Sequence, residues 1–177
     1  EFLGWYTENG IHITEDSIVS NAQAHTVSAR WTEKYAELLF VGNGGKVISD
    51  GKQEAKLSKL YVYKKPYGQL PQAVRNGYRF AGWFTAPVQG NQILPEKQCD
   101  VKLADTYYAQ WNANRYEVQF DANGGSCGTQ KITVVFGENY GRLPVPTYEG
   151  YSFAGWYTQR NGGEKVTSET KVKILGT

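Results

Sequence analysis

The sequence predicts a mainly β (α+β) protein that is built from tandem copies of one small unit. Three observations support this class: a recurring phrase, a period-two alternation of apolar residues, and the lack of any long helix-favouring stretch. The phrase GYRFAGWF at 77–84 returns as GYSFAGWY at 150–157, and the chain opens with FLGWY at 2–6. We expect each unit to be a curved mixed sheet of about four strands with at most one short helix.

The spacing between repeated phrases locates an insertion. The AsnGlyGly triplets at 43–45 and 123–125 lie 80 residues apart, whereas the two FAGW phrases lie only 73 apart. The difference predicts seven extra residues in the earlier copy, within the stretch that contains GKQEAKLSK. An insertion confined to one place is typical of a surface loop, which tolerates extra length.

These spacings divide the chain into three parts. Residues 1–31 correspond to the C-terminal half of a repeat, residues 35–111 to a complete repeat with the insertion, and residues 116–177 to a repeat that lacks its last strand. The linkers, 32–34 and 112–115, are short, so we expect neighbouring units to keep a preferred orientation. The closing Trp of the last unit would fall past the end of the sequence, and we expect the chain to be a slice of a longer array.

The first strand of each unit follows from alternation. Tyr116, Val118 and Phe120 alternate with polar residues, and residues 36–40 repeat the pattern. The triplets that follow contain residues that accept positive φ, which predicts a tight turn. The predicted turn residues are Asn43, Gly44, Gly45, Asn123, Gly124 and Gly125.

The remaining elements are assigned in chain order. Residues 59–63 and 131–136 are expected to form second strands. Pro144 and Pro146 disfavour a long helix in the next segment, so a turn or one short helical piece is expected there. The FAGW phrases then form third strands, and the last strands are TYYAQW and HTVSARW.

The order of FDANGG, YGRLPVPTYEGYSFAGWYT and YYAQW resembles the Listeria–Bacteroides repeat, the internalin B-type B repeat of bacterial surface proteins. The resemblance covers nearly the whole chain, as one half unit and two near-complete ones. It implies a β-grasp-like module that is found in tandem on secreted or wall-attached proteins. Two departures, VGNGG in place of an acidic FDANGG-type sequence and the seven-residue insertion, concern loops more than the fold.

The aromatic residues of the recurring phrase have two interpretations. They could form sugar-stacking platforms or protein-binding anchors, because Trp and Tyr are favoured at interfaces. Recurrence in every copy favours a structural role, in which large side chains fill the core of a small domain. The predicted core residues are Trp5, Phe80, Trp83, Phe120, Phe153 and Trp156. Trp31 and Trp111 close their units and are the better candidates for an interface between repeats.

The insertion and its flanks, residues 46–65, are the most distinctive chemical feature. Six lysines against Asp50 and Glu54 give this stretch a local net charge of +4, and tyrosines are interleaved. Such a surface can hold sulfated glycans or acidic wall polymers, but lysines also protect a solvated hairpin from edge-to-edge pairing. The candidate binding residues are Lys56, Lys59, Tyr61, Tyr63, Lys64 and Lys65.

Composition and motifs argue against several classes of function. Lys plus Arg number 19 and Asp plus Glu 17, so the formal net charge of +2 gives no reason to expect nucleic-acid binding. No apolar run is long enough to span a bilayer. His12 and His25 have no counterpart in the next copy, and no cysteine or histidine spacing fits a metal site. We therefore expect no catalysis, no metal and no cofactor.

The two cysteines, Cys99 and Cys127, belong to different units. A disulfide between them would tie one module to the next, and two free thiols are the alternative. The low number of cysteines fits the resemblance to bacterial surface modules, which often lack disulfides.

The leading hypothesis is a set of non-catalytic extracellular repeats on a cell surface or cell wall. They would act as a semi-rigid spacer or stalk, with a further role in adhesion, and their partners would be neighbouring repeats of the same chain. One alternative is a module that binds a glycan or a host surface protein through the insertion. Another is an accessory module of a surface enzyme.

Overall fold

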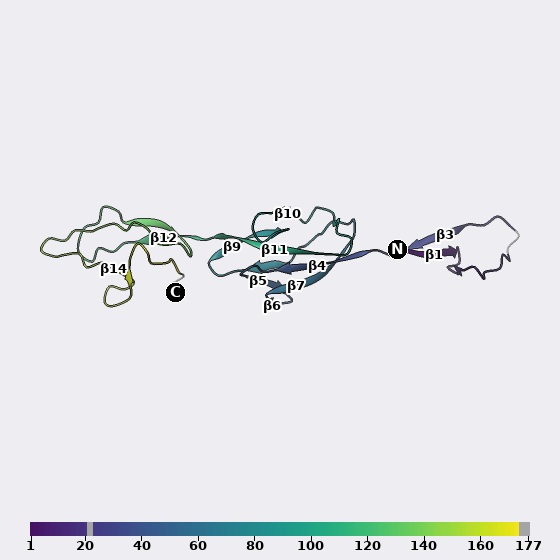
Figure 1. Cartoon of the computed structure of the whole chain (residues 1–177), viewed down its shortest axis with the longest axis horizontal. Coiled ribbons are helices and arrows are strands. Elements are labelled where there is room, and N and C mark those ends of the chain that lie inside the picture. Colours follow the sequence, from purple (N-terminus) through teal and green to yellow (C-terminus); the bar gives the residue numbers. More distant parts are fainter. Residues whose placement is uncertain (21–22, 174–177) are drawn as a thin grey trace.

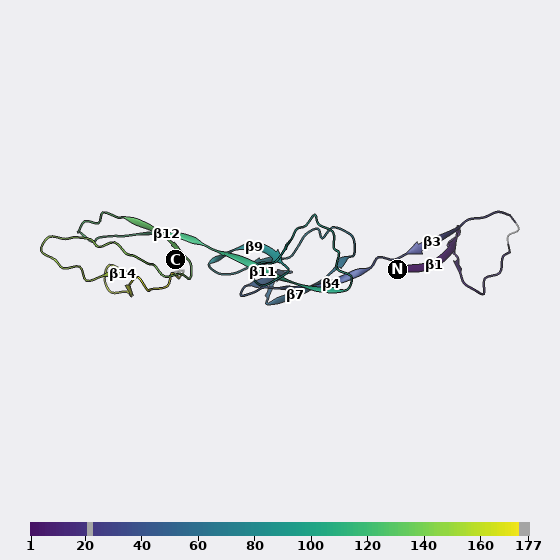
Figure 2. The same ribbon diagram turned by 45° about the horizontal axis from the view of Figure 1, so that its top comes forward.

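The computed structural model describes residues 1–20 and 23–173, so residues 174–177 of the last predicted unit lie outside the described residues. Figure 1 shows three lobes in a row along the longest axis, and Figure 2 shows the same row after a turn of 45°. The elements of this part of the chain are all strands, which confirms the mainly β class. The described residues contain no helix that could cross a membrane.

The middle lobe is built on a five-stranded mixed sheet with the strand order β10-β9-β11-β4-β7. Its strands are β4 (Tyr35–Val41), β7 (Lys56–Val62), β9 (Tyr78–Phe84), β10 (Gln92–Ile93) and β11 (Ala104–Ala113). β4 and β11 are parallel neighbours, and the other pairs are antiparallel. The first and last strands of the unit therefore lie side by side within the sheet.

The core of the middle lobe follows from alternation along these strands. Ala36, Leu38 and Phe40 of β4 are fully buried, while Glu37, between Ala36 and Leu38, is exposed, which is the period-two pattern of a half-buried strand. The ring of Phe40 meets the ring of Trp83 edge-on, with centroids 4.9 Å apart. The hydroxyl oxygens of Tyr67 and Tyr107 lie 3.2 Å apart inside the same cluster.

The seven-residue insertion forms a hairpin outside the main sheet. β5 (Lys46–Ser49) and β6 (Lys52–Glu54) pair antiparallel around Asp50 and Gly51, which both have positive φ. β5 also pairs with β8 (Gln72–Val74), which gives the small sheet β6-β5-β8. The chain after the first AsnGlyGly turn thus leaves the main sheet and returns to it only with β7.

The first lobe contains one three-stranded sheet with the order β2-β1-β3. Its strands are β1 (Phe2–Thr7), β2 (His12–Ile13) and β3 (Val27–Trp31). By sequence these strands correspond to β9, β10 and β11, and they keep the same order. In the part of the chain that the structure describes, the first lobe has no counterpart of β4 or β7.

The third lobe contains two separate pairs of strands. These are β12 (Arg115–Gln119) with β13 (Lys131–Val135), and β14 (Trp156–Tyr157) with β15 (Lys165–Val166). Within residues 115–173 no strand joins the two pairs, and a groove of about 830 Å³ lies between them. The third strand that was expected after Gly150 is reduced to two residues, because β14 has β15 as its one strand neighbour among the described residues, and a strand is stabilised by its neighbours.

Candidate functional site

The contact between the second and third lobes is built around one linker residue. β11 extends to Ala113 and β12 begins at Arg115, so only Asn114 lies between them, and the expected linker 112–115 is too long. The Asn114 amide donates to the Gly77 carbonyl at 2.9 Å. The Asn114 carbonyl accepts a hydrogen bond from the Phe136 amide, also at 2.9 Å. One residue thereby ties a turn of the second unit to a turn of the third.

An aromatic pair reinforces these hydrogen bonds. The ring of Phe136, from the third unit, meets the ring of Tyr78, from the second, with centroids 5.4 Å apart and planes at 83°. Gly77 has a φ of +79°, and a Cβ there would lie 2.3 Å from the Phe136 ring. Only glycine satisfies both the backbone conformation and the close approach. The junction is therefore a packed interface as well as a short linker.

The first junction repeats part of this arrangement. The amide of Tyr63 donates to the carbonyl of Lys34 at 2.7 Å, and these residues correspond by sequence to Phe136 and Asn114. Thr32 and Glu1 exchange backbone hydrogen bonds across the end of the first sheet. Tyr63 thus occupies the position of a junction residue, although it was expected in a ligand-binding surface.

The two closing tryptophans do not lie in the contacts between units that the structure describes. The indole nitrogen of Trp111 donates to the carbonyls of Gly42 and Asn43, both at 3.1 Å, within its own unit. The ring lies so close to Gly45 that a Cβ there would be 2.3 Å away. Trp31 is 69% exposed and contacts the Phe2 ring of its own lobe. Trp111 therefore packs on and hydrogen-bonds to the AsnGlyGly turn of its own unit. The contacts between repeats that the structure describes are formed by other residues.

The AsnGlyGly turns have the same backbone form in both copies. Asn43 has a φ of 46° and Asn123 a φ of 47°, and the first glycine after each of them, Gly44 or Gly124, also has positive φ. The Asn43 side chain donates to the Pro87 carbonyl at 2.8 Å and to the Ala109 carbonyl at 2.9 Å. The turn thus binds the last strand of its unit through this side chain.

The recurring Trp makes the same hydrogen bond in both copies. The indole nitrogens of Trp83 and Trp156 donate to the carbonyls of Pro71 and Pro144, each at 2.8 Å. Trp83 is 1% exposed and lies in the core, with Phe80 packed against it, whereas Trp156 and its neighbour Phe120 are half-buried.

Two predicted core residues are largely open to solvent. Trp5 is 49% exposed and Phe153 is 43% exposed, which corrects the expectation that both lie in a core. The physical reason is the same for both residues. Their lobes lack, within the described residues, the neighbouring strands that cover Trp83 and Phe80 in the middle lobe.

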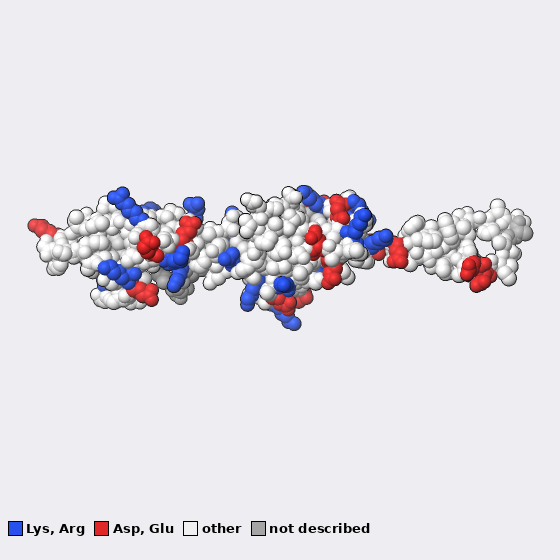
Figure 3. Space-filling model, viewed as in Figure 1, with Lys and Arg blue, Asp and Glu red and all other residues white. Residues whose placement is uncertain are grey.

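The structure does not gather the candidate binding residues on one surface. Alternation along β7 places Lys59 on the face of the buried Tyr61 and Lys56 on the opposite face. Lys64 forms an ion pair with Asp100, which raises the pKa of its ammonium group, and Lys65 lies beyond the end of β7. Figure 3 shows acidic and basic atoms interspersed on the visible face of the middle lobe.

Tyr61 is a core residue rather than a binding residue. It is 5% exposed, and burial raises the pKa of its hydroxyl to about 12. The hydroxyl oxygen has no hydrogen-bond partner among the described residues. Burial also raises the pKa of Tyr67 and of Tyr107. These phenols therefore stay neutral at physiological pH, and the ring of Tyr61 is not accessible for stacking against a ligand.

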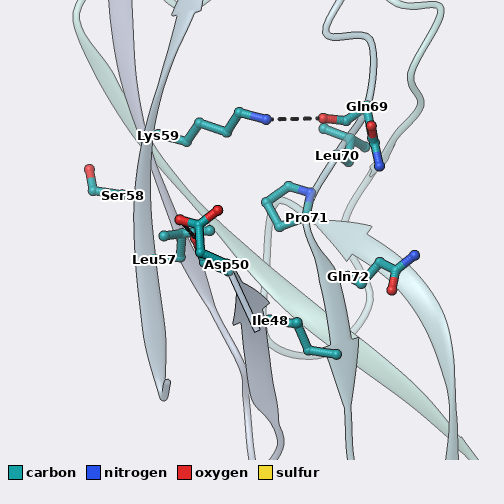
Figure 4. Close-up of a pocket in the computed structure, with 10 residues that line it drawn as sticks. Ile48, Asp50, Leu57, Ser58, Lys59, Gln69, Leu70, Pro71 and Gln72 are labelled. Carbon is teal, nitrogen blue, oxygen red and sulfur yellow. Dashed lines mark hydrogen bonds between the residues drawn. The ribbon is translucent and has the colours of Figure 1, made fainter. Parts of the chain in front are cut away.

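A pocket of about 590 Å³ lies between the inserted hairpin, β7 and residues 69–72. In Figure 4 the Lys59 side chain reaches across this space, and its ammonium nitrogen donates to the Gln69 carbonyl at 3.3 Å. The Asp50 carboxylate also lines the pocket, beside Leu57. This set can exchange hydrogen bonds with hydroxyl groups, and it offers no accessible aromatic ring.

The structure contains two free thiols. Cys99 is fully buried in the core of the second unit, and Cys127 lies half-buried in a loop of the third. The Cys127 thiol donates to the carbonyl of Thr129 at 3.0 Å. Cys99 and Cys127 are therefore free thiols, and no disulfide joins them. No cluster of His, Cys, Asp or Glu that could hold a metal occurs among residues 1–20 and 23–173.

Sequence reasoning missed the residues that form the second junction. Gly77, Tyr78, Asn114 and Phe136 were not singled out, because two of them lie in a phrase that was assigned to the core strand. A signal was nevertheless present. Tyr63 and Phe136 occupy the same position in two copies, directly after the second strand, and both are aromatic.

Comparison with known proteins matches residues 37–110 and 116–176 to the Listeria-Bacteroides repeat domain. Internalin H of Listeria monocytogenes is 32% identical over 144 residues, which cover 79% of this chain and 23% of that protein. A protein of Evansella cellulosilytica whose name describes a membrane protein is 27% identical over 176 residues, which cover 97% of this chain and 24% of that protein. No solved structure matches the chain.

The chain spans about a quarter of the length of these two relatives. The two matched stretches together cover more than half of the chain and contain the AsnGlyGly turns and the FAGW phrases of the second and third units. The resemblance that the motifs indicated is thus confirmed, and the chain belongs to the Listeria-Bacteroides repeat family.

Proposed function

We propose that these repeats are non-catalytic modules of a cell-surface protein and act as a semi-rigid spacer. The observation that carries the proposal is the second junction, where Asn114 makes backbone hydrogen bonds to both units and Phe136 packs on Tyr78. A single linker residue with contacts on both sides leaves little freedom for rotation. The partners of each unit are then the neighbouring repeats of its own chain.

An extracellular location, at a cell surface or cell wall, is part of the same proposal. Its support is the family itself and the relatives, one an internalin and another described as a membrane protein. The arrangement of three lobes in a row also suits a spacer, because each added unit extends the chain in one direction (Figure 1).

The experiment is a distance distribution between the second and third units. We expect fluorescent labels at the exposed positions Lys102 and Gln159 to give one narrow distribution by single-molecule energy transfer. Insertion of a flexible Gly-Ser segment after Asn114 should broaden it, because the two hydrogen bonds can no longer form together. A broad distribution in the unaltered chain would show freely jointed units and would contradict the spacer.

A second candidate function, glycan binding, is favoured by the pocket beside the inserted hairpin. Its polar groups match the hydroxyls of a saccharide, and the insertion that forms one wall is missing from the third unit. Binding to immobilised glycans should be lost in Lys59→Ala and in a chain without residues 49–55. Lys52→Ala is the matched control, because Lys52 does not line the pocket. Binding that survives both changes would place the ligand elsewhere.

A further inference from the structure

The path of the chain through the middle lobe determines where tension would act. The chain reaches this lobe from residues 32–34 at the start of β4 and leaves it at the end of β11. β4 and β11 are parallel neighbours, so these two points lie at opposite ends of one strand pair. In Figure 1 this pair runs along the row of lobes. Tension between the first and third lobes therefore pulls β4 and β11 past one another along their own direction.

Such a load shears the ladder rather than peeling it. Five residue pairs join the strands, from Ala104 opposite Glu37 to Tyr108 opposite Val41, and the Glu37 amide also donates to the Leu103 carbonyl at 2.8 Å. Bonds between the strands lie across the pulling direction and share the load, so they must fail together. In a peeling geometry the bonds fail one after another, each under the whole load.

Side chains near the exit of the unit brace the same strand pair. The Asn43 side chain, just after β4, donates to the Ala109 carbonyl of β11, and the Trp111 indole of β11 donates to the carbonyls of Gly42 and Asn43. These three hydrogen bonds connect the strands outside the backbone ladder. They would have to break if β11 slid along β4.

The ladder is also shielded from water. Leu38 and Phe40 of β4 and Tyr107 and Ala109 of β11 are buried. Strand neighbours cover both edges of the pair, with β9 beside β11 and β7 beside β4. Water can therefore not replace single hydrogen bonds until the sheet itself opens.

We infer that the parallel β4–β11 pair is a tension-bearing clamp of the repeat, so that a complete unit resists stretching in line with the array. The first and third lobes lack one strand of this pair within the described residues, and the middle lobe therefore carries the clamp. For its biological use the inference rests on the proposed spacer function. The mechanical property itself does not depend on that function.

The test is single-molecule force spectroscopy on the whole chain with two attachment geometries. Handles on non-natural residues at Glu33 and Arg115 load β4 against β11 in shear. Handles at Glu33 and Lys65 load β4 against β7 instead. Because β7 is antiparallel to β4 and Tyr35 pairs with Val62, the second geometry peels that pair from one end. All three handle positions are exposed, and the sequence of the core is the same in both molecules.

We expect the unfolding force at one loading rate to be several times higher in the shear geometry, because forced unfolding reports the barrier along the pulled direction. Equal forces, or a lower force in shear, would overturn the clamp. The outcome is separate from that of the energy-transfer experiment. A weak clamp leaves the orientation of the units untouched, and freely jointed units leave the ratio of the two forces untouched.

Discussion

Phe136 of the third unit packs edge-on against Tyr78 of the second, with ring centroids 5.4 Å apart. Removing the ring in Phe136→Ala should weaken the junction by about 1 kcal/mol, the typical contribution of such a pair. The backbone bonds of Asn114 do not depend on this side chain. We therefore expect the distance distribution between the two units to broaden while the unfolding midpoint of the second unit stays the same.

The matched control is Tyr63→Ala. Tyr63 holds the position of Phe136 at the first junction, so the same kind of side chain is removed from the same place in a repeat. The change should leave the orientation of the second and third units unaltered. A broadening as large as that of Phe136→Ala would mean that the ring pair does not set the orientation.

Trp83 and Trp156 make the same indole hydrogen bond at 2.8 Å but differ in burial. Trp83→Phe loses both the hydrogen bond and packing in a closed core, and we expect a loss of about 3 kcal/mol in the free energy of unfolding. Trp156→Phe should cost about 1 kcal/mol, because this half-buried ring loses less packing along with the hydrogen bond. Hydrogen exchange on β9 and β12 would measure the two units separately. Equal losses would show that burial does not decide the role of this Trp.

The features that could be predicted from the sequence are those set by residues close to one another along the chain. Alternation located β4 and β12, and the AsnGlyGly composition located turns in which Asn43 and Asn123 have positive φ. Both features depend on residues close in sequence. The insertion was expected as a surface loop or a solvated hairpin, but the pairing of β5 with β8 was not expected, because it joins residues whose partners no local pattern identifies.

The candidate site was harder to predict for the same reason. Lysines that are close in sequence, such as Lys56 and Lys59, point to opposite faces of β7, so charge counting overestimated the basic surface. The second junction was missed because Gly77 and Phe136 are distant in sequence. They meet only because β11 continues through Asn114 into β12, which brings the two units into contact.

The buried hydroxyl of Tyr61 predicts a loss of stability at high pH. Burial raises its pKa from 10.0 in the unfolded chain to about 12 in the fold, so the neutral form is favoured in the folded state. Stability is therefore full below pH 10 and declines as the pH rises from 10 to 12. Tyr61→Phe should reduce this decline and, since the hydroxyl has no hydrogen-bond partner in the part of the chain that the structure describes, should not destabilise the unit at neutral pH.

The measurement is chemical denaturation of the parent chain and of Tyr61→Phe at several pH values between 7 and 12. Tyr67 and Tyr107 also have raised pKa values, so part of the alkaline decline should remain in the variant. Identical slopes against pH in the two proteins would show that Tyr61 does not titrate in this way.

Deletion of residues 49–55 should give the second unit the same spacing between its AsnGlyGly turn and its FAGW phrase as the third unit has, without unfolding it. The deletion removes the turn at Asp50 and all of β6, but it retains the residues of β5 that pair with β8. Loop-closure entropy changes slowly with length, so we expect the free energy of unfolding to change by less than about 1 kcal/mol. Circular dichroism and thermal unfolding would measure this. Loss of the folded signal would show that the hairpin supports the core.

The groove of the third unit should accept a closing strand like that of the second. Among the described residues, β12 pairs only with β13 and β14 only with β15. Val172 forms two backbone hydrogen bonds, to Gly137 and Glu138, as Cys99 does to Lys64 and Lys65 in the second unit. Appending the β11 sequence DTYYAQWNA after Thr177 should place an added Trp against the turn at Asn123. We expect Phe153 and Trp156 to become buried and the amides of β12 to gain protection from hydrogen exchange, because both open edges are then paired. The control is the same extension with the Ala before Gln changed to Lys and the Trp changed to Ala. This extension should neither fit the groove nor contact the turn. Equal protection from hydrogen exchange in both chains would rule out this mode of closure.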